Sequence, residues 1–290
     1  MQAVAEKKEN FRIIDLINWG EDYFRNNKFE NPKQEIEWLL CDLLNYKKND
    51  LYINFEEIVS QEKQALLKKW TKKRLKRMPL QYITGNTEFY GKKFFINGDV
   101  LIPRQETERL VDISLQCIEK INEPNILEVG TGSGCISISV ALKRKDARLL
   151  SIDVSEKALK KAKENSDFHN VKNISFAKVD ILNELPKGKY DILISNPPYI
   201  SYNDMQSIMI DVKDFEPELA LTDFKDGLQF YDRFSDIGPS IVKKGGWILL
   251  EVGINEHPNK VKRLFESKGY KNLNFLKDYN NDKRVLKVKI

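Results

Sequence analysis

A carboxamide, two prolines and an aromatic ring follow one another in the sequence Asn-Pro-Pro-Tyr at residues 196–199. The apolar run 192–194 before them predicts a buried parallel strand. Proline must end this strand, because it has no N–H and restricts the residue before it. Asn196 is therefore expected at the carboxyl end of a strand, the edge where open α/β sheets bind ligands. There its side-chain oxygen and the Pro197 carbonyl can accept the N–H groups of an amide or aromatic amine and orient the nitrogen.

The alternative is a plain Asn-Pro turn after a strand, and an isolated Asn-Pro-Pro would favour it. The complete motif resembles the signature of amino-group methyltransferases that use S-adenosylmethionine. In this interpretation Tyr199 packs against the flat face of the substrate. A site for that cofactor elsewhere in the chain would decide between the two interpretations.

A glycine-rich run, Gly-Thr-Gly-Ser-Gly at residues 130–134, follows the predicted strand 126–129 and precedes a predicted helix. Glycines let the backbone approach a ligand where a Cβ atom would clash, although an ordinary glycine-rich turn is the alternative. The dinucleotide fingerprint G-x-G-x-x-G fits less well, because Cys135 stands at the place of its third glycine. The run thus favours an amino-acid-bearing nucleoside over a pyrophosphate.

Three acidic residues, Glu128, Asp153 and Asp180, stand at the ends of predicted strands. Asp153 has about the spacing expected of an acid that binds ribose hydroxyls, and Asp180 can accept from an adenine amino group. The alternatives are a helix cap for Asp153 and a surface turn for Asp180. Three carboxylates favour a cationic sulfonium ligand over a pyrophosphate.

Composition indicates an ordinary globular protein without a metal centre. Of 290 residues, 41% are hydrophobic and 31% charged, and the net charge is +5. Three widely spaced cysteines and two histidines provide neither zinc-ligand spacing nor a disulfide framework. The first ten residues lack an apolar core and no long apolar run follows, so we expect no signal peptide, no membrane span and a cytoplasmic location.

Residues 11–77 carry apolar side chains at helical spacing and predict a small all-α bundle. Pro32 suits a first helical turn, and Ser60 suits the N-cap of a helix that turns Leu66, Leu67 and Trp70 inward. Seven basic residues in 68–77 indicate either a solvated face or a docking surface for an acidic or RNA-bound partner.

Residues 88–98 read as an aromatic β-hairpin that links the bundle to the next domain. Thr107, flanked by acidic residues, suits the start of a helix running to about residue 121. From residue 125 strands and helices alternate, which predicts a doubly wound, largely parallel sheet with an antiparallel hairpin at its edge. We therefore expect a helical domain at 1–84, a linking hairpin at 85–104 and a catalytic domain at 105–290.

Several further runs make nearly the whole chain resemble the HemK/PrmC family of protein-glutamine N5-methyltransferases. They are Arg-Met-Pro-Leu-Gln-Tyr-Ile-Thr-Gly at 77–85, Leu-Ile-Pro-Arg at 101–104, Glu-Thr-Glu at 106–108, Phe-Glu-Pro at 215–217, Asp-Gly-Leu at 226–228 and Glu-Val-Gly at 251–253. Gln105 departs from the proline usual in the family, and Ile181 is smaller than the usual side chain there.

The resemblance implies a class I methyltransferase fold with a mostly parallel seven-stranded sheet. It implies that S-adenosylmethionine, the precursor of S-adenosylhomocysteine, is held by Glu128, Gly130, Thr131, Gly132, Ser133, Gly134, Asp153, Asp180, Ile181 and Asn196. The substrate glutamine would be bound by Asn196, Pro197, Pro198, Tyr199 and Arg104, with Asn196, Pro197 and Tyr199 at the reacting amide. That glutamine lies in the Gly-Gly-Gln loop of class 1 peptide release factors, which the helical domain would help to bind.

Two other enzymatic functions share the motif at 196–199. One is methylation of a glutamine in a ribosomal protein, and the other is methylation of a base amino group in a nucleic acid. The small helical region of mixed charge weighs against nucleic-acid specificity. The intact glycine loop and motif weigh against a non-catalytic binding module. We expect a monomer that acts on release factors.

Overall fold

The computed structural model describes residues 10–290, so the start of the chain, where we expect no signal peptide, lies outside the described residues. The chain divides into two compact units, Met1–Gly85 and Asn86–Ile290. Within residues 10–290, no helix combines the length and apolar character needed to cross a membrane.

The described part of the first unit, residues 10–85, is built from five helices joined by short connections. They are α1 (Ile13–Asn26), α2 (Pro32–Leu44), α3 (Lys48–Ile53), α4 (Gln61–Leu75) and α5 (Leu80–Thr84). Its core is made of aliphatic and aromatic side chains at helical spacing, among them Phe24, Ile36 and Leu40. The strands β1 (Phe11–Arg12) and β2 (Ile58–Val59), which the sequence pattern does not predict, pair antiparallel. The helical bundle is thus confirmed, with one small sheet added.

The helix boundaries in this unit follow the predicted signals closely. Pro32 lies in the first turn of α2, and the Ser60 hydroxyl accepts from the Lys63 N–H at the start of α4. The inward orientation predicted for Leu66 is wrong, because its side chain is exposed while Leu67 is buried. The reason is that α4 buries a narrow face made partly of polar residues, including Arg74.

Two members of the basic run 68–77 are not available for docking. Arg74 forms a two-pronged ion pair with Glu35 of α2, with N–O distances of 2.7 and 2.9 Å. The Arg77 guanidinium stacks over the Phe29 ring, 4.4 Å from its centroid. The exposed basic surface of α4 and its C-cap therefore consists of lysines, namely Lys63, Lys68, Lys69 and Lys72 in the helix and Lys76 at the C-cap.

The second unit is a seven-stranded sheet in the order β10-β11-β9-β8-β5-β6-β7. Its strands are β5 (Asn125–Val129), β6 (Arg148–Asp153), β7 (Ile174–Lys178), β8 (Tyr190–Ser195), β9 (Val242–Glu251), β10 (Leu273–Lys277) and β11 (Lys283–Lys289). Neighbouring strands run parallel from β9 to β7, whereas β11 runs antiparallel to both β9 and β10. This is the predicted mostly parallel sheet with its antiparallel edge hairpin.

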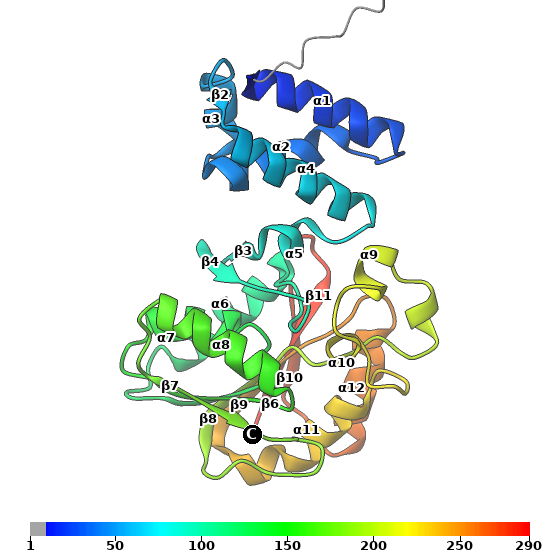
Figure 1. Ribbon diagram of the computed structural model, residues 1–290. Coiled ribbons are helices and arrows are strands. Elements are labelled where there is room, and N and C mark those ends of the chain that lie inside the picture. The colour runs from blue at the N-terminus through cyan, green and yellow to red at the C-terminus, as the bar shows by residue number, and fades with distance from the viewer. Residues whose placement is uncertain (1–9) are drawn as a thin grey trace, which may run out of the picture. The chain divides into compact units, whose positions relative to one another are not determined.

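Strand residues alternate between two cores, one on each face of the sheet. Ile126 and Ile192 pack with α6 (Glu108–Ile118) and α7 (Cys135–Lys143) on one face. Leu127 and Leu193 pack with α11 (Gln229–Ile241) and α12 (His257–Ser267) on the other. The helices that cover the two faces of the sheet can be followed in Figure 1. Because the central strands are buried on both faces, their ends are held rigidly.

Two parts of this unit differ from the sequence prediction. Strand β9 begins at Val242 rather than at residue 247, and it continues through Gly245 and Gly246. The backbone of Gly246 lies so close to β8 that a Cβ atom there would be 2.6 Å from the Asp191 carbonyl. The segment after β8 contains three short helices that lack a periodic pattern. They are η2 (Asp204–Gln206), α9 (Ile210–Lys213) and α10 (Glu218–Leu221).

The hairpin of β3 (Asn86–Phe89) and β4 (Lys92–Phe95) belongs by its contacts to the second unit. Phe89 and Phe94 are almost fully buried in the core on the α6 and α7 side of the sheet. The side chain of Asn165, in α8 (Glu156–Phe168), bonds to both the N–H and the carbonyl of Phe95. The region that we expect to link the two domains is therefore packed into the core of one of them.

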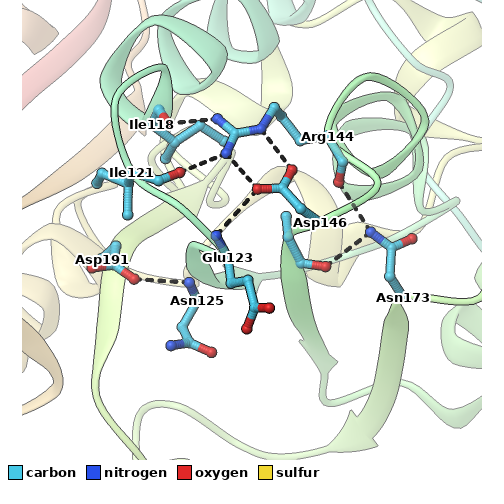
Figure 2. Close-up of polar contacts among 9 residues, drawn as sticks. Ile118, Ile121, Glu123, Asn125, Arg144, Asp146, Asn173 and Asp191 are labelled. Carbon is cyan, nitrogen blue, oxygen red and sulfur yellow. Dashed lines mark hydrogen bonds and ion pairs between the residues drawn. The ribbon is translucent and has the colours of Figure 1, made fainter.

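The amino edge of the sheet, opposite the strand ends predicted to carry the site, is held by a polar network (Figure 2). Arg144 donates to the Ile118 and Ile121 carbonyls at the end of α6 and pairs with Asp146. This pairing holds the pKa of Asp146 well below its ordinary value. The network gives a donor to the Ile121 carbonyl beyond the end of α6 and a second donor to the Ile118 carbonyl, which also accepts from the Ile121 N–H at 3.0 Å.

We predict that Arg144→Met lowers the free energy of unfolding by about 1–3 kcal/mol, because the Ile121 carbonyl loses the Arg144 donor and the Ile118 carbonyl keeps only the Ile121 N–H. Urea denaturation measures this change. Arg148→Met is the matched control, since Arg148 makes an exposed pair with Glu123 that contributes little. Equal destabilisation by the two substitutions would contradict the role assigned to Arg144.

Candidate active site

The loops that follow β5, β6 and β8 meet at the carboxyl edge of the sheet around one cavity of about 300 Å³. The strands are in register there, because Val129 pairs with both Ile152 and Ser195. Most of the predicted site residues line this cavity. These are Arg104, Gly130, Thr131, Gly132, Ser133, Asp153, Asp180, Ile181, Asn196, Pro197 and Pro198.

The first two glycines of the loop keep the backbone bare where it faces the cavity. Gly130 and Gly132 have φ angles of 75° and 54°, which side-chain-bearing residues rarely adopt. The Gly130 N–H donates to the Ile152 carbonyl at 2.9 Å, and the Gly132 N–H donates to Asp153 at 3.0 Å. The loop is thus tied to the end of the neighbouring strand β6.

Gly134 is placed differently from the first two glycines of the loop. It is absent from the cavity wall formed by the described residues, and a Cβ atom there would lie 2.9 Å from Ile138 and 3.1 Å from Ala162. Gly134 therefore lets the start of α7 pack closely against α8. A ligand contact is not needed to explain this glycine.

Glu128 also lies behind the described cavity wall rather than in it. Its side chain is buried, and one carboxylate oxygen accepts from the Thr131 hydroxyl at 2.6 Å. Burial raises the pKa of Glu128 to about 7, although the bond from Thr131 lowers it. Glu128 thus supports the glycine loop from beneath.

Asp153 and Asp180 present carboxylates at the ends of β6 and after β7. Asp153 accepts from the backbone N–H groups of Gly132 and Ser155, and burial raises its pKa. Asp180 accepts from the Leu182 N–H at 3.0 Å and from the Asn183 side chain at 2.7 Å. Each carboxylate oxygen has further lone pairs for a ligand's hydroxyl or amino group.

Asn196 follows the last residue of the central strand β8. The Ser195 hydroxyl donates to the Val129 carbonyl at 2.8 Å, which ties the end of β8 to β5. The Asn196 side-chain NH2 group donates to the Thr107 hydroxyl at 3.3 Å. With its NH2 group engaged there, the carboxamide oxygen is left for a donor in the cavity.

Tyr199 lies outside the cavity wall of the described residues, and the packing of its ring on the substrate stays a prediction. Its ring lies 5.7 Å from the His257 ring, centroid to centroid. Gly227, at φ 82°, packs so closely that a Cβ atom there would lie 2.3 Å from the Tyr199 carbonyl. The tyrosine therefore anchors the loop.

His257 completes this anchor as a neutral imidazole. Its Nδ1 atom accepts from the Gly253 N–H at 3.1 Å, so its Nε2–H donates to the Gly227 carbonyl, also at 3.1 Å. Burial lowers the pKa of His257, in keeping with the neutral form. The ring therefore joins the ends of β9 and of the segment before α11 beside Tyr199.

Arg104 lines the cavity and pairs with Glu216, whose carboxylate also accepts from the Ile102 N–H at 3.2 Å. Sequence reasoning assigned no function to Glu216, although it lies in the run 215–217 that carries the family resemblance. It also missed a wall formed by Pro217, Leu219 and Phe224, because these residues show no periodicity. What marks these residues in the structure is that they form an apolar cluster in the same cavity wall as the motif at 196–199, with Leu219 and Phe224 exposed.

Comparison with known proteins assigns the family. The chain matches the PrmC N-terminal domain over residues 15–85 and the methyltransferase small domain over 108–212. It is 38% identical to the release factor glutamine methyltransferase of Fusobacterium nucleatum, over 98% of this chain and 79% of that protein. The chain belongs to the release factor glutamine methyltransferase family. The member of this family from Geobacter sulfurreducens is 31% identical, over 98% of both chains.

A solved structure agrees with the family's methyltransferase fold. A methyltransferase from Pyrococcus furiosus superposes with a TM-score of 0.51 at 18% identity, over 69% of this chain and 91% of that one. The predicted class I methyltransferase fold is thereby confirmed.

We predict that Gly132→Val abolishes S-adenosylmethionine binding in calorimetry, because a side chain at φ 54° would project beside the bare loop. Gly269→Val is the matched control. Gly269 has a φ of 89°, and at both glycines no heavy atom of the described chain lies within 4 Å of the place that a Cβ atom would take. It lies away from the cavity, so the control should bind normally; equal loss in both variants would contradict a ligand contact.

Proposed function

We propose that this enzyme transfers a methyl group from S-adenosylmethionine to the side-chain amide nitrogen of the glutamine in the Gly-Gly-Gln loop of class 1 peptide release factors. The observation that carries the proposal is the Asn196 carboxamide, held at the cavity with its NH2 group bonded to Thr107. Full-length similarity to release factor glutamine methyltransferases supports the choice of protein substrate.

The residues around the cavity fit S-adenosylmethionine. Gly130 and Gly132 present backbone without side chains, Asp153 and Asp180 present carboxylates, and Ile181 adds an apolar wall that is 3% exposed. Carboxylates suit ribose hydroxyls and an amino group, and the apolar side chain suits the face of a purine. When bound, the cofactor supplies an activated methyl group.

Asn196 and Pro197 are the residues we assign to the reacting amide. An amide nitrogen is a poor nucleophile, because its lone pair is delocalised into the carbonyl. Two acceptors, the Asn196 Oδ1 atom and the Pro197 carbonyl, would hold both N–H bonds and turn the lone pair toward the methyl group. Such positioning contributes to rate without an acid or a base. Pro198 fixes the backbone beside them, and Tyr199 is assigned to anchoring the loop.

Asn196→Ala should slow single-turnover methylation of a release factor by about 100-fold or more at saturating cofactor, because an acceptor is lost in a closed site. Asn196→Asp should be similarly slow, since it adds a charge and loses the donor to Thr107. The exposed loop residue Asn255 provides the control Asn255→Asp, which should turn over normally. If both Asn196 variants are as fast as the wild-type protein, Asn196 has no part in the mechanism.

The identity of the substrate is tested by mixing the wild-type protein with labelled cofactor, a release factor, a ribosomal protein and DNA. The proposal predicts label on the release factor, and peptide mass spectrometry should place one methyl group on the glutamine of Gly-Gly-Gln. Label on the ribosomal protein or on DNA, with none on the release factor, would overturn it.

We assign the helical unit to binding the body of the release factor rather than its target glutamine. It has its own apolar core, and the exposed lysines of α4 offer a positive surface. A protein truncated to residues 86–290 keeps both cores of the second unit, so it should bind cofactor and methylate a short Gly-Gly-Gln peptide at the wild-type rate. Methylation of the whole release factor should fall at least tenfold. A truncated protein as active on the whole factor would contradict the assignment.

A further inference from the structure

The target carboxamide has a carbonyl oxygen as well as a nitrogen, and the residues assigned to it above hold only the nitrogen. Asn196 Oδ1 and the Pro197 carbonyl accept from its two N–H groups. In a closed site a carbonyl oxygen without a donor costs free energy, because it has given up its hydrogen bonds to water. The Asn196 NH2 group is not that donor, since it bonds to the Thr107 hydroxyl at 3.3 Å. The carbonyl therefore needs another donor beside Asn196.

Arg104 is placed beside Asn196 by the turn that joins it to Thr107. The Thr107 N–H donates to the Arg104 carbonyl at 3.2 Å, and the Thr107 hydroxyl accepts from Asn196. Both Arg104 and Asn196 line the cavity. Among residues 10–290, Glu216 is the one hydrogen-bond partner of the guanidinium, so its other N–H groups are left for a ligand. The Arg104 side chain is 35% exposed, which lets a ligand in the cavity reach these groups.

Glu216 places an opposite charge directly at the Arg104 guanidinium. The Glu216 side chain is 1% exposed, and its other carboxylate oxygen accepts from the Ile102 N–H at 3.2 Å. A buried carboxylate needs partners of this kind, so a purely structural pair is the alternative interpretation. The position of Arg104 in the cavity wall gives the pair a second property. It offers N–H donors to a ligand while carrying no net charge.

The absence of net charge on the pair decides which ligand side chain it favours. A guanidinium without a counter-charge binds a carboxylate more strongly than a neutral carboxamide, often through two parallel hydrogen bonds. With Glu216 beside it, the Arg104 charge is compensated, and the extra attraction for an anion is largely lost. Glutamate has nearly the shape of glutamine and differs in that charge. The pair therefore suits the carbonyl of a glutamine.

We infer that Arg104 donates to the carbonyl oxygen of the target glutamine, and that Glu216 is a positioning residue that keeps this contact selective for a carboxamide over a carboxylate. The inference rests on the proposed transfer to a glutamine amide. A hydrogen bond to the carbonyl draws the nitrogen lone pair further toward the oxygen, so it does not make the nitrogen a better nucleophile. Arg104 thus acts on substrate binding and selectivity more than on the rate of methyl transfer.

The first test measures how strongly a Gly-Gly-Glu peptide inhibits methylation of a Gly-Gly-Gln peptide. In Glu216→Gln the new side chain can still accept from Ile102, but it no longer compensates the Arg104 charge. Relative to the KM of the glutamine peptide, the inhibition constant of the glutamate peptide should fall by about tenfold or more. Glu218→Gln is the matched control, because it removes the same charge from a nearby exposed residue and should leave this ratio unchanged. An unchanged ratio in Glu216→Gln, or an equal change in both variants, would overturn the inference.

A double variant shows whether the Arg104 charge causes this change. Arg104→Met combined with Glu216→Gln removes both charges, so the stronger inhibition by the glutamate peptide should disappear. A double variant that keeps the stronger inhibition would overturn the inference, because a disturbed cavity wall would then explain the effect of Glu216→Gln.

Arg104→Met alone tests the inference if Glu216→Gln does not fold. Methionine keeps an apolar stem but removes the donors, so the KM of the Gly-Gly-Gln peptide should rise by about tenfold, with a smaller effect on kcat. Calorimetry should show unchanged affinity for S-adenosylhomocysteine. A wild-type KM, a fall in kcat larger than the rise in KM, or an equal loss of affinity for S-adenosylhomocysteine would count against the contact and overturn the inference.

The wild-type reaction separates this inference from the proposed function. A wild-type protein that methylates neither the release factor nor the Gly-Gly-Gln peptide overturns both. A wild-type protein that methylates them, with variants that discriminate between glutamine and glutamate as it does, overturns only the assignment of Arg104 and Glu216.

Discussion

The central constraint in this structure is the end of β8 in the middle of the sheet. Strand β8 lies between β5 and β9, and it stops at Ser195 because Pro197 and Pro198 have no N–H for a ladder. The Ser195 hydroxyl, bonded to the Val129 carbonyl, fixes this end against β5. A side chain on the next residue is thus placed by two neighbouring strands rather than by a mobile loop. Precision of this kind is what positioning chemistry requires.

Two buried carboxylates support the site from below, at a cost in stability. Glu128 and Glu251 each keep one oxygen without a hydrogen-bond partner among the described residues, and burial raises the pKa of both to about 7. Perturbed groups of this kind concentrate at functional sites. Glu128 bonds to Thr131 in the glycine loop, and Glu251 is the last residue of β9, the strand next to β8. Glu128 therefore orients a threonine that lines the cavity.

Local patterns in the sequence predicted most of the fold. The alternation after residue 125 indicated the strands and helices of the sheet, and Pro32 and Ser60 marked helix starts correctly. Strand β9 was predicted too short, because Gly245 and Gly246 interrupt its apolar pattern. The short helices between residues 204 and 221 were missed because they bury few side chains and have no periodicity.

The site was predicted less completely, because its remaining features depend on contacts distant in sequence. Nothing local to Thr107 shows that its hydroxyl meets Asn196 instead of capping α6. Likewise, the packing of Gly134 against Ala162 and of Tyr199 against His257 joins separate elements. Residue types at strand ends therefore predicted where the site lies. Which of these residues line the cavity, and which lie behind it, could be seen only in the three-dimensional structure.

The most direct test of this account is a crystal structure of the protein with S-adenosylhomocysteine and a glutamine-containing peptide. The account predicts that the glutamine amide nitrogen lies within hydrogen-bonding distance of both Asn196 Oδ1 and the Pro197 carbonyl. A peptide whose glutamine carbonyl oxygen meets Asn196 Nδ2, or whose glutamine lies outside the cavity, would contradict it.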